Sequence, residues 1–122
     1  MRETDTLGKL MMEKLRDEAI SFAEGLLSQH WKAPSLKKLQ RELKALDKHQ
    51  RELVLRTVRA SIDSGVHAFL FALQEAGEDG RIKIKVNGKD IADSTDGLHG
   101  ELFTPEGWQA RFSAYGEAPK EA

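Results

Sequence analysis

Residues 73–91 read LQEAGEDGRIKIKVNGKDI, and the hydrophobic period changes within this stretch. Up to Ala76, apolar residues recur at steps of three and four, which is the spacing of a helix face. After Gly80, apolar and basic residues alternate, which is the spacing of a half-buried strand. We therefore predict an α+β fold in which N-terminal helices, one of them long, pack on a small C-terminal antiparallel β-meander of two hairpins. The helical part is expected over residues 5–77 and the sheet over residues 81–115.

The helix before this change is the longest expected element. Asp47 and Gln50 have the spacing of a capping box, which predicts a helix start at Asp47. Apolar residues then follow at helical steps up to Leu73. A helix that ends at Ala76 would be roughly 43 Å long, so we expect it to bend, to protrude or to be shared with a second copy. Gly65 marks the expected bend or close helix crossing, because it has no side chain to hold helices apart.

Two further helices are expected before the long one. The first is predicted over residues 5–28, with Thr4 or Asp5 capping its first turn. The second is short and capped by Ser35, because Pro34 disfavours helix in the residue before it. The first helix should bury one apolar stripe. That stripe consists of Leu7, Leu10, Met11, Leu15, Phe22, Leu26 and Leu27.

Asn87-Gly88 is the stronger of two turn signals in the C-terminal half. This pair favours a two-residue type I′ turn, because both residues tolerate a positive φ. The turn would pair Lys85 with Asp90 and Ile84 with Ile91. Charge and burial agree with this register, which predicts the first hairpin.

A second hairpin is predicted around the turn Thr104–Gly107, which suits a type I turn with a glycine bulge. The pairing would set Glu101 opposite Arg111. It would also place one apolar face on the helices. That face consists of Leu98, Leu102, Trp108, Ala110 and Phe112.

The composition is typical of a small globular protein. The chain has 122 residues, of which 39% are hydrophobic and 32% charged, and its formal net charge is −1. We expect a single domain over residues 1–116 and a frayed polar tail over residues 117–122. The balanced charge makes nucleic acid an unexpected partner. The absence of cysteine excludes thiolate chemistry, and the chain shows neither a signal peptide nor an apolar run long enough for a membrane, so we expect a cytoplasmic protein.

Two Asp/His pairs are the candidate metal ligands. Asp63 and His67 share one face of the long helix, and Asp96 and His99 lie in the loop after the first hairpin. If the pairs meet at the helix–sheet junction, they could bind zinc or manganese and serve a hydrolase-like enzyme. The favoured alternative is a polar piece of core without a metal, cofactor or catalytic residue.

A binding surface is the second candidate site. Outward-facing side chains of the predicted sheet could dock a protein by charge complementarity. The charged candidates on this face are Lys83, Lys85, Glu101 and Arg111, and His99 and Trp108 complete the candidate set. A basic row from Lys37 to Arg51 could follow a phosphate backbone, but the acidic residues beside it favour a solvated helix face.

The stretches IDSGVHAFLFALQE (residues 62–75), DGLHGE (residues 96–101) and Gly107-Trp108 resemble small bacterial cytosolic proteins, which are in turn reminiscent of the immunity partners of secreted toxins. The resemblance implies a protein-binding role and assigns no functional residue. The sequence contains no phosphate loop, nucleophile elbow or metalloprotease motif. We therefore expect a non-enzymatic protein-interaction domain of the immunity type. The alternatives are the metal-dependent enzyme and a homo-oligomer joined through the long helix.

Overall fold

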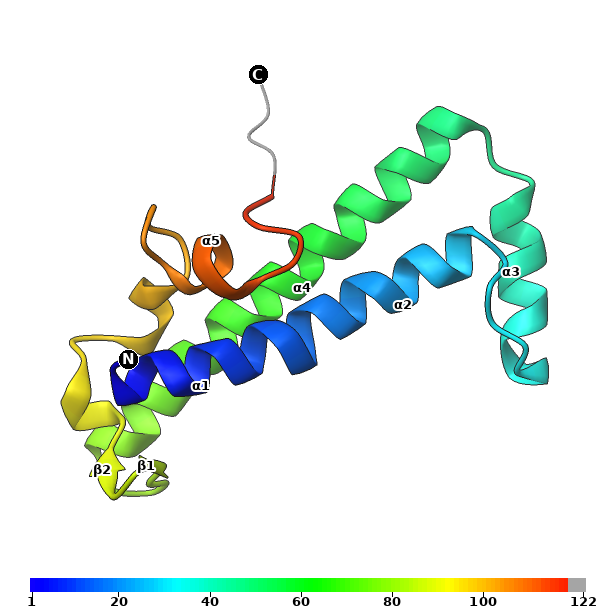
Figure 1. Ribbon diagram of the computed structural model, residues 1–122. Coiled ribbons are helices and arrows are strands. Elements are labelled where there is room, and N and C mark those ends of the chain that lie inside the picture. Colours follow the sequence, from blue (N-terminus) through cyan, green and yellow to red (C-terminus); the bar gives the residue numbers. More distant parts are fainter. Residues whose placement is uncertain (119–122) are drawn as a thin grey trace.

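Most of the chain is helical in the computed structural model, which describes residues 1–118 (Figure 1). Two long helical rods run antiparallel and cross one another; α3 links them at one end, and the hairpin, the C-terminal turns and α5 lie around the other end. The helical part consists of α1 (Glu3–Met11), a π-helical segment (Met12–Arg16), α2 (Asp17–Leu27), a 3-10 turn (Pro34–Leu36), α3 (Lys37–Lys44) and α4 (Lys48–Glu78). The C-terminal part consists of β1 (Lys85–Val86), β2 (Lys89–Asp90), two 3-10 turns (Ala92–Ser94 and Leu98–Glu101) and α5 (Trp108–Phe112).

The first rod differs from its prediction in the face that it buries. Leu10, Leu15 and Phe22 are 58%, 47% and 42% exposed, whereas Met12 and Arg16 are fully buried. The π-helical segment adds a residue to one turn, and this rotates the side chains that follow relative to a regular helix. The predicted apolar stripe is wrong at those three exposed positions, and the π-helical turn accounts for Leu15 and Phe22, which lie within it and after it.

The predicted caps of the first two helices are also wrong. The first rod begins at Glu3, and Thr4 and Asp5 are buried inside its first turn. The Asp5 carboxylate bonds to other side chains of the fold and not to the amides of the turn. At Ser35 the chain forms a 3-10 turn before α3, without a side-chain cap.

The start of α4 confirms the capping box. The backbone amide of Gln50 donates to Asp47 Oδ1 at 2.8 Å, and the amide of Asp47 donates to Gln50 Oε1 at 3.0 Å. The helix is continuous to Glu78. A Cβ at Gly65 would meet nothing within 4 Å, so the predicted close crossing there is wrong.

The first hairpin is confirmed in its turn and register. Asn87 and Gly88 have φ angles of 51° and 82°, as a type I′ turn requires. Lys85 pairs with Asp90, and the amide of Ile91 donates to the carbonyl of Ile84 at 2.9 Å. The two strands have only two residues each, so the sheet is smaller than predicted.

The second predicted hairpin is wrong. Its strands are replaced by the 3-10 turn at Leu98–Glu101 and by α5, although the intervening turn forms with a 2.8 Å bond from the amide of Gly107 to the carbonyl of Thr104. Leu98 and Leu102 are four residues apart, and so are Trp108 and Phe112. That spacing suits a single helical turn as well as it suits a strand. The packing of Trp108 against the first rod decides between the two.

The core lies between the first rod, the C-terminal half of α4 and the C-terminal turns. Its fully buried members are Met11, Met12, Val66, Leu70, Leu73, Ile91, Leu98, Leu102 and Trp108. Val66 is the first fully buried residue of α4. The N-terminal half of the helix therefore extends beyond the core. Of the three alternatives predicted for the long helix, this is the second, a helix that protrudes.

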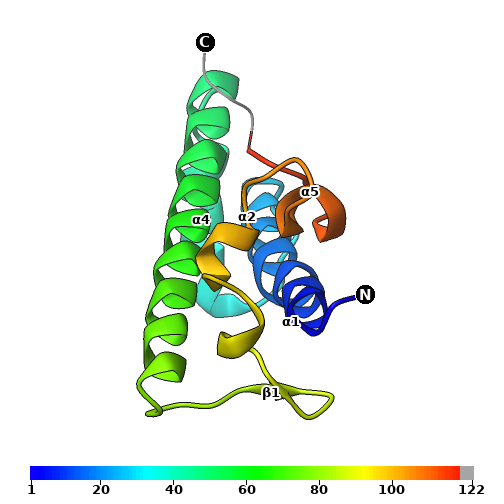
Figure 2. The ribbon, with the colours of Figure 1, turned by 90° about the vertical axis from the view of Figure 1, so that its left-hand side faces the viewer.

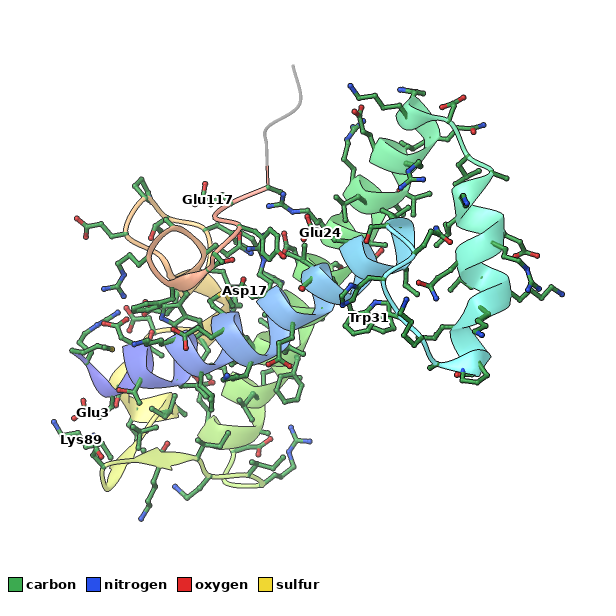
Figure 3. All side chains as sticks on the ribbon, turned by 45° about the vertical axis from the view of Figure 1, so that its right-hand side comes forward. Glu3, Asp17, Glu24, Trp31, Lys89 and Glu117 are labelled. Carbon is green, nitrogen blue, oxygen red and sulfur yellow. The ribbon has the colours of Figure 1, made fainter. Side chains whose placement is uncertain are left out.

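Polar bonds fasten the C-terminal segment and the hairpin to the first rod (Figure 3). Ser113 Oγ donates to Asp17 at 2.5 Å, and the Tyr115 hydroxyl donates to Glu24 at 2.6 Å. Lys89 of β2 lies 3.5 Å from Glu3. Residues 119–122, the end of the predicted frayed tail, lie outside the described residues. None of the helices over residues 1–118 combines the length and apolar character that crossing a bilayer requires.

Candidate protein-binding surface

The structure divides the four predicted metal ligands. Asp63 accepts bonds from Nε and Nη2 of the buried Arg16, at 2.6 and 3.3 Å. His67 and His99 do meet, with ring centroids 5.2 Å apart. Within residues 1–118, no group of three or more His, Cys, Asp or Glu side chains is placed to hold a metal ion. The junction is therefore a meeting of two imidazoles, and the Asp63 carboxylate serves Arg16.

These two imidazoles belong to a row of four rings. The ring of His99 lies edge-on to Phe71, with centroids 5.0 Å apart, and His67 stacks on Phe103 at 5.9 Å. Phe71 and Phe103 are 47% and 49% exposed. The row therefore presents aromatic surface on one side of α4.

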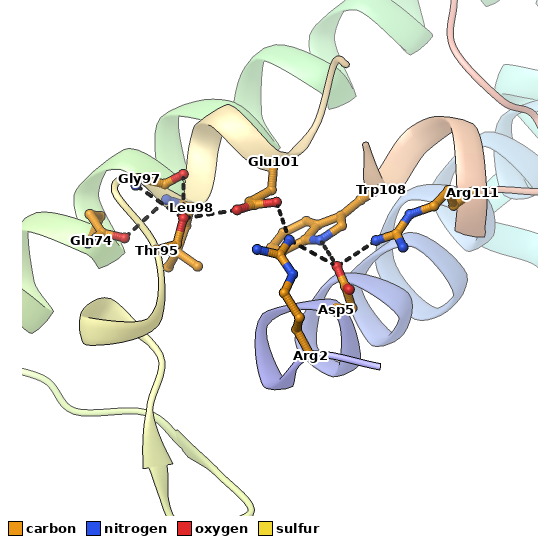
Figure 4. A network of polar contacts seen from close by, with 9 residues as sticks. All are labelled: Arg2, Asp5, Gln74, Thr95, Gly97, Leu98, Glu101, Trp108 and Arg111. Atoms are coloured by element: carbon orange, nitrogen blue, oxygen red, sulfur yellow. Dashed lines mark hydrogen bonds and ion pairs between the residues drawn. The ribbon is translucent and has the colours of Figure 1, made fainter. Parts of the chain in front are cut away.

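An open depression of about 630 Å³ adjoins this row, and it is lined by Arg2 and the loop from Asp93 to Glu101. Glu101 accepts bonds at 2.9 Å from both Arg2 and Thr95 (Figure 4). The hydrogen bond to Glu101 raises the pKa of Arg2 above its usual value. Asp96 lines the same depression beside His99. The depression is polar, and its Arg2–Glu101 pair is mutually neutralising.

Trp108 was predicted to belong to the binding surface, but its side chain is fully buried. Its ring packs on Gly8, and its indole nitrogen donates to Asp5 at 3.3 Å (Figure 4). Arg111 donates to the same carboxylate at 2.5 Å, so its predicted pairing with Glu101 is wrong. Burial alone would raise the pKa of Asp5, but the bonds from Arg111 and Arg2 outweigh it and hold the pKa below 3.8.

The remaining predicted binding residues do not form one sheet face. Lys83 bonds to Asp90 at 3.2 Å, and Lys85 is exposed on β1. His99 and Glu101 lie in a 3-10 turn against α4. The predicted face needed a second hairpin, and that segment folds as helical turns.

A different surface follows α4 itself, and we call it the outer face of α4. Its residues are spaced by 4, 3, 4, 3 and 4, so they follow one flank of the helix beside the buried stripe of Val66 and Leu70. In Figure 2, α4 runs along one edge of the molecule. The 3-10 turn at Leu98–Glu101 packs beside its C-terminal half, where His99 contacts His67 and Phe71. All members except the half-buried His67 are exposed. The outer face of α4 consists of Leu53, Thr57, Ala60, Ser64, His67 and Phe71.

The centre of this helix lacks exposed charge. Between Ala60 and Gln74 the only Asp, Glu, Lys or Arg is Asp63, which is bonded to the buried Arg16. In a chain that is 32% charged, a solvent-facing helix surface is normally charged or polar. Phe69, on the flank of the same helix, is 56% exposed. Helical periodicity could have revealed this second stripe, but the stronger buried stripe dominates the pattern.

The two ends of α4 carry opposite charge. Lys48, His49 and Arg56 lie in or near its first turns, and Glu75 and Glu78 lie in its last turn or just before it. The outer face of α4 is therefore an apolar strip between a basic end and an acidic end.

No protein-family model, curated protein or solved structure matches this chain. The fold and the surface define a mostly helical α+β protein with an uncovered helix face. The likeness to bacterial immunity proteins stays a prediction from the sequence.

Proposed function

We propose that this protein is a non-enzymatic protein-interaction domain and that it binds its partner through the outer face of α4. The observation that carries this proposal is the absence of exposed charge from the centre of α4, where Asp63 is bonded to the buried Arg16, together with the exposed rings of Phe71 and Phe103. The immunity-type role is the version of this function that the sequence resemblance favours.

The chemistry of the outer face supports a protein partner. The centres of protein interfaces are depleted of charged residues and enriched in aromatic ones. Exposed aromatic rings held by neighbouring rings lose little conformational freedom when a partner covers them. Phe71 and Phe103 are each in contact with a histidine ring, so the surface is already ordered before binding.

The use of the acidic side chains supports a non-enzymatic role. Asp63 is held by Arg16, and Glu101 is held by Arg2 and Thr95. A carboxylate whose oxygens already accept bonds from a guanidinium is engaged by the fold and is not free to contact a substrate. These two carboxylates therefore contribute to the fold.

The test compares capture by matched arginine variants. We expect the tagged wild-type protein to capture a partner from cells of its natural source, and both Leu53→Arg and Phe71→Arg to lose it. Leu10→Arg is the control, because Leu10 is 58% exposed on α1 and lies outside the outer face of α4. Quantitative mass spectrometry measures capture, and thermal melting verifies that all variants fold. Equal capture by all four proteins would refute the proposal.

A further inference from the structure

We infer that the partner of the outer face of α4 is a second copy of this chain, bound antiparallel so that the basic end of each α4 meets the acidic end of the other. The inference rests on the proposed function and names the partner of the same surface. Three features of the chain carry it: the segregation of charge, the order of side-chain sizes and the overhang of α4.

Charge is strongly segregated along a chain whose net charge is nearly zero. Residues 32–59 contain nine Lys or Arg and three Asp or Glu, whereas residues 60–118 contain five Lys or Arg and ten Asp or Glu. The first range includes α3 and the protruding half of α4. The second includes the C-terminal half of α4 and the elements that cover the core. A surface with one basic and one acidic end is complementary to a second copy of itself when that copy is reversed.

Side-chain size along the outer face of α4 has the same symmetry. Large residues, Leu53 and Phe71, lie near the two ends, and the small residues Ala60 and Ser64 lie at the centre. In an antiparallel pair centred between Ala60 and Ser64, Leu53 of one copy faces Phe71 of the other. Small residues at the centre permit the two helices to approach closely.

The same register also pairs the remaining positions. Thr57 faces His67 of the second copy, and His49 faces Glu75, with Lys48 and Glu78 nearby. The steps of 4 and 3 are those of a two-helix seam, in which each side chain packs between residues of the facing helix. Because a two-fold axis relates the copies, every contact occurs twice.

A parallel pair would be unfavourable for the same reasons. It would set Leu53 against Leu53 and Phe71 against Phe71, with both basic ends together and both acidic ends together. Like charges held side by side repel. The N-terminal half of α4, which has no fully buried residue before Val66, packs on α2 on one side, where Arg51 donates to the carbonyl of Leu27. A second chain along the outer face of α4 would bury its exposed side.

The first measurement is the mass in solution. Sedimentation equilibrium over micromolar concentrations should give twice the chain mass of 13.7 kDa for the wild type at the high end. Leu53→Arg should raise the dimer dissociation constant by about tenfold or more, since a charge would enter the seam. Leu10→Arg should leave it unchanged. A wild type that is monomeric at every concentration would overturn the inference, and so would a dimer that tolerates Leu53→Arg.

The second measurement fixes the direction of the pair. The chain has no cysteine, so any disulfide that forms must involve the introduced cysteines. A mixture of Leu53→Cys and Phe71→Cys should form a mixed disulfide on oxidation. Neither variant alone should cross-link in the antiparallel pair, because its two sulfurs would lie roughly 27 Å apart along the helix axis. Rapid cross-linking of Leu53→Cys to itself would show a parallel pair and refute the antiparallel arrangement.

The proposed function and this inference can fail separately. A monomeric wild type that still captures a different protein, and loses it in Leu53→Arg but not in Leu10→Arg, would refute the second copy and retain the interaction domain. A dimer that survives Leu53→Arg, with partner capture also unchanged by that variant, would refute both.

Discussion

Two helix glycines differ in what surrounds them, although both lie in the interior of a helix. A Cβ at Gly8 would lie 2.3 Å from Cδ2 and Cε2 of the fully buried Trp108. A Cβ at Gly65 would meet nothing within 4 Å. Gly8 is therefore required by the close packing of the indole on α1, whereas Gly65 weakens its helix and no neighbouring atom requires it.

Alanine at these two positions should shift stability in opposite directions. Gly65→Ala should raise the free energy of unfolding by about 1 kcal/mol, because alanine favours helix over glycine by that amount. Gly8→Ala gains the same helix preference but must displace a buried indole, and overpacking costs about 1–3 kcal/mol. We expect a net loss there, measured by urea denaturation of the monomeric chain. Equal stabilisation by both alanines would show that Trp108 is loosely packed.

Asp5 should make stability depend on pH in the acid range. Its folded-state pKa lies below 3.8, since the bonds from Arg111 and Arg2 outweigh its burial. Such a carboxylate contributes stability that is complete above the unfolded pKa and is lost as the pH falls through the lower, folded pKa. The stability difference between the wild type and Asp5→Asn should therefore be constant near neutral pH and shrink as the pH falls below 3.8. Urea denaturation at several pH values measures this difference, and a difference that grows in acid would contradict the assignment.

At the scale of elements, sequence motifs correctly predicted the helix cap and the hairpin turn, because interactions between residues close in the sequence stabilise both. The capping box of Asp47 and Gln50 and the turn at Asn87-Gly88 each act over a few residues, and both formed as expected. The second hairpin failed because its apolar spacing also fits helical turns, and the choice depends on a contact between Trp108 and Gly8, exactly one hundred residues apart in sequence.

The π-helical segment depends on contacts that are equally distant. It turns Arg16 into the interior, where Nε bonds to Asp63 and Nη1 bonds to Ser113 Oγ and Gly116 O at 2.7 and 2.6 Å. An arginine in a helix is normally exposed, so nothing near Arg16 in the sequence predicts its burial. Because Asp63 accepts the bond from Arg16 Nε, it does not join the other predicted metal ligands. The sequence allowed an approach of His67 to His99 as one alternative, but it could not reveal the use of the Asp63 carboxylate.

At the scale of the whole molecule, the predicted overhang of α4 is present, and the charge of the chain is divided along its length. The balanced total charge led us to expect no nucleic-acid partner, but a sum over the chain hides the separation of the basic residues 32–59 from the acidic remainder. In the folded chain, this separation places basic residues at the N-terminal end of α4 and acidic residues at its C-terminal end. This polarity favours an antiparallel second copy as the partner.

Reversing one charge at each end of α4 tests whether this direction matters. In the proposed dimer, His49→Glu would place a carboxylate opposite Glu75, and Glu75→Lys would place an ammonium group beside His49 and Lys48. Each single variant should raise the dimer dissociation constant by about threefold, because exposed pairs are weak but occur twice. Both changes suit the dipole of their own helix end, so the folded monomer should not lose stability. The double variant should recover the wild-type constant in sedimentation experiments at low salt, and both single effects should fade at high salt. Additive losses in the double variant would show that these residues do not face each other across the seam.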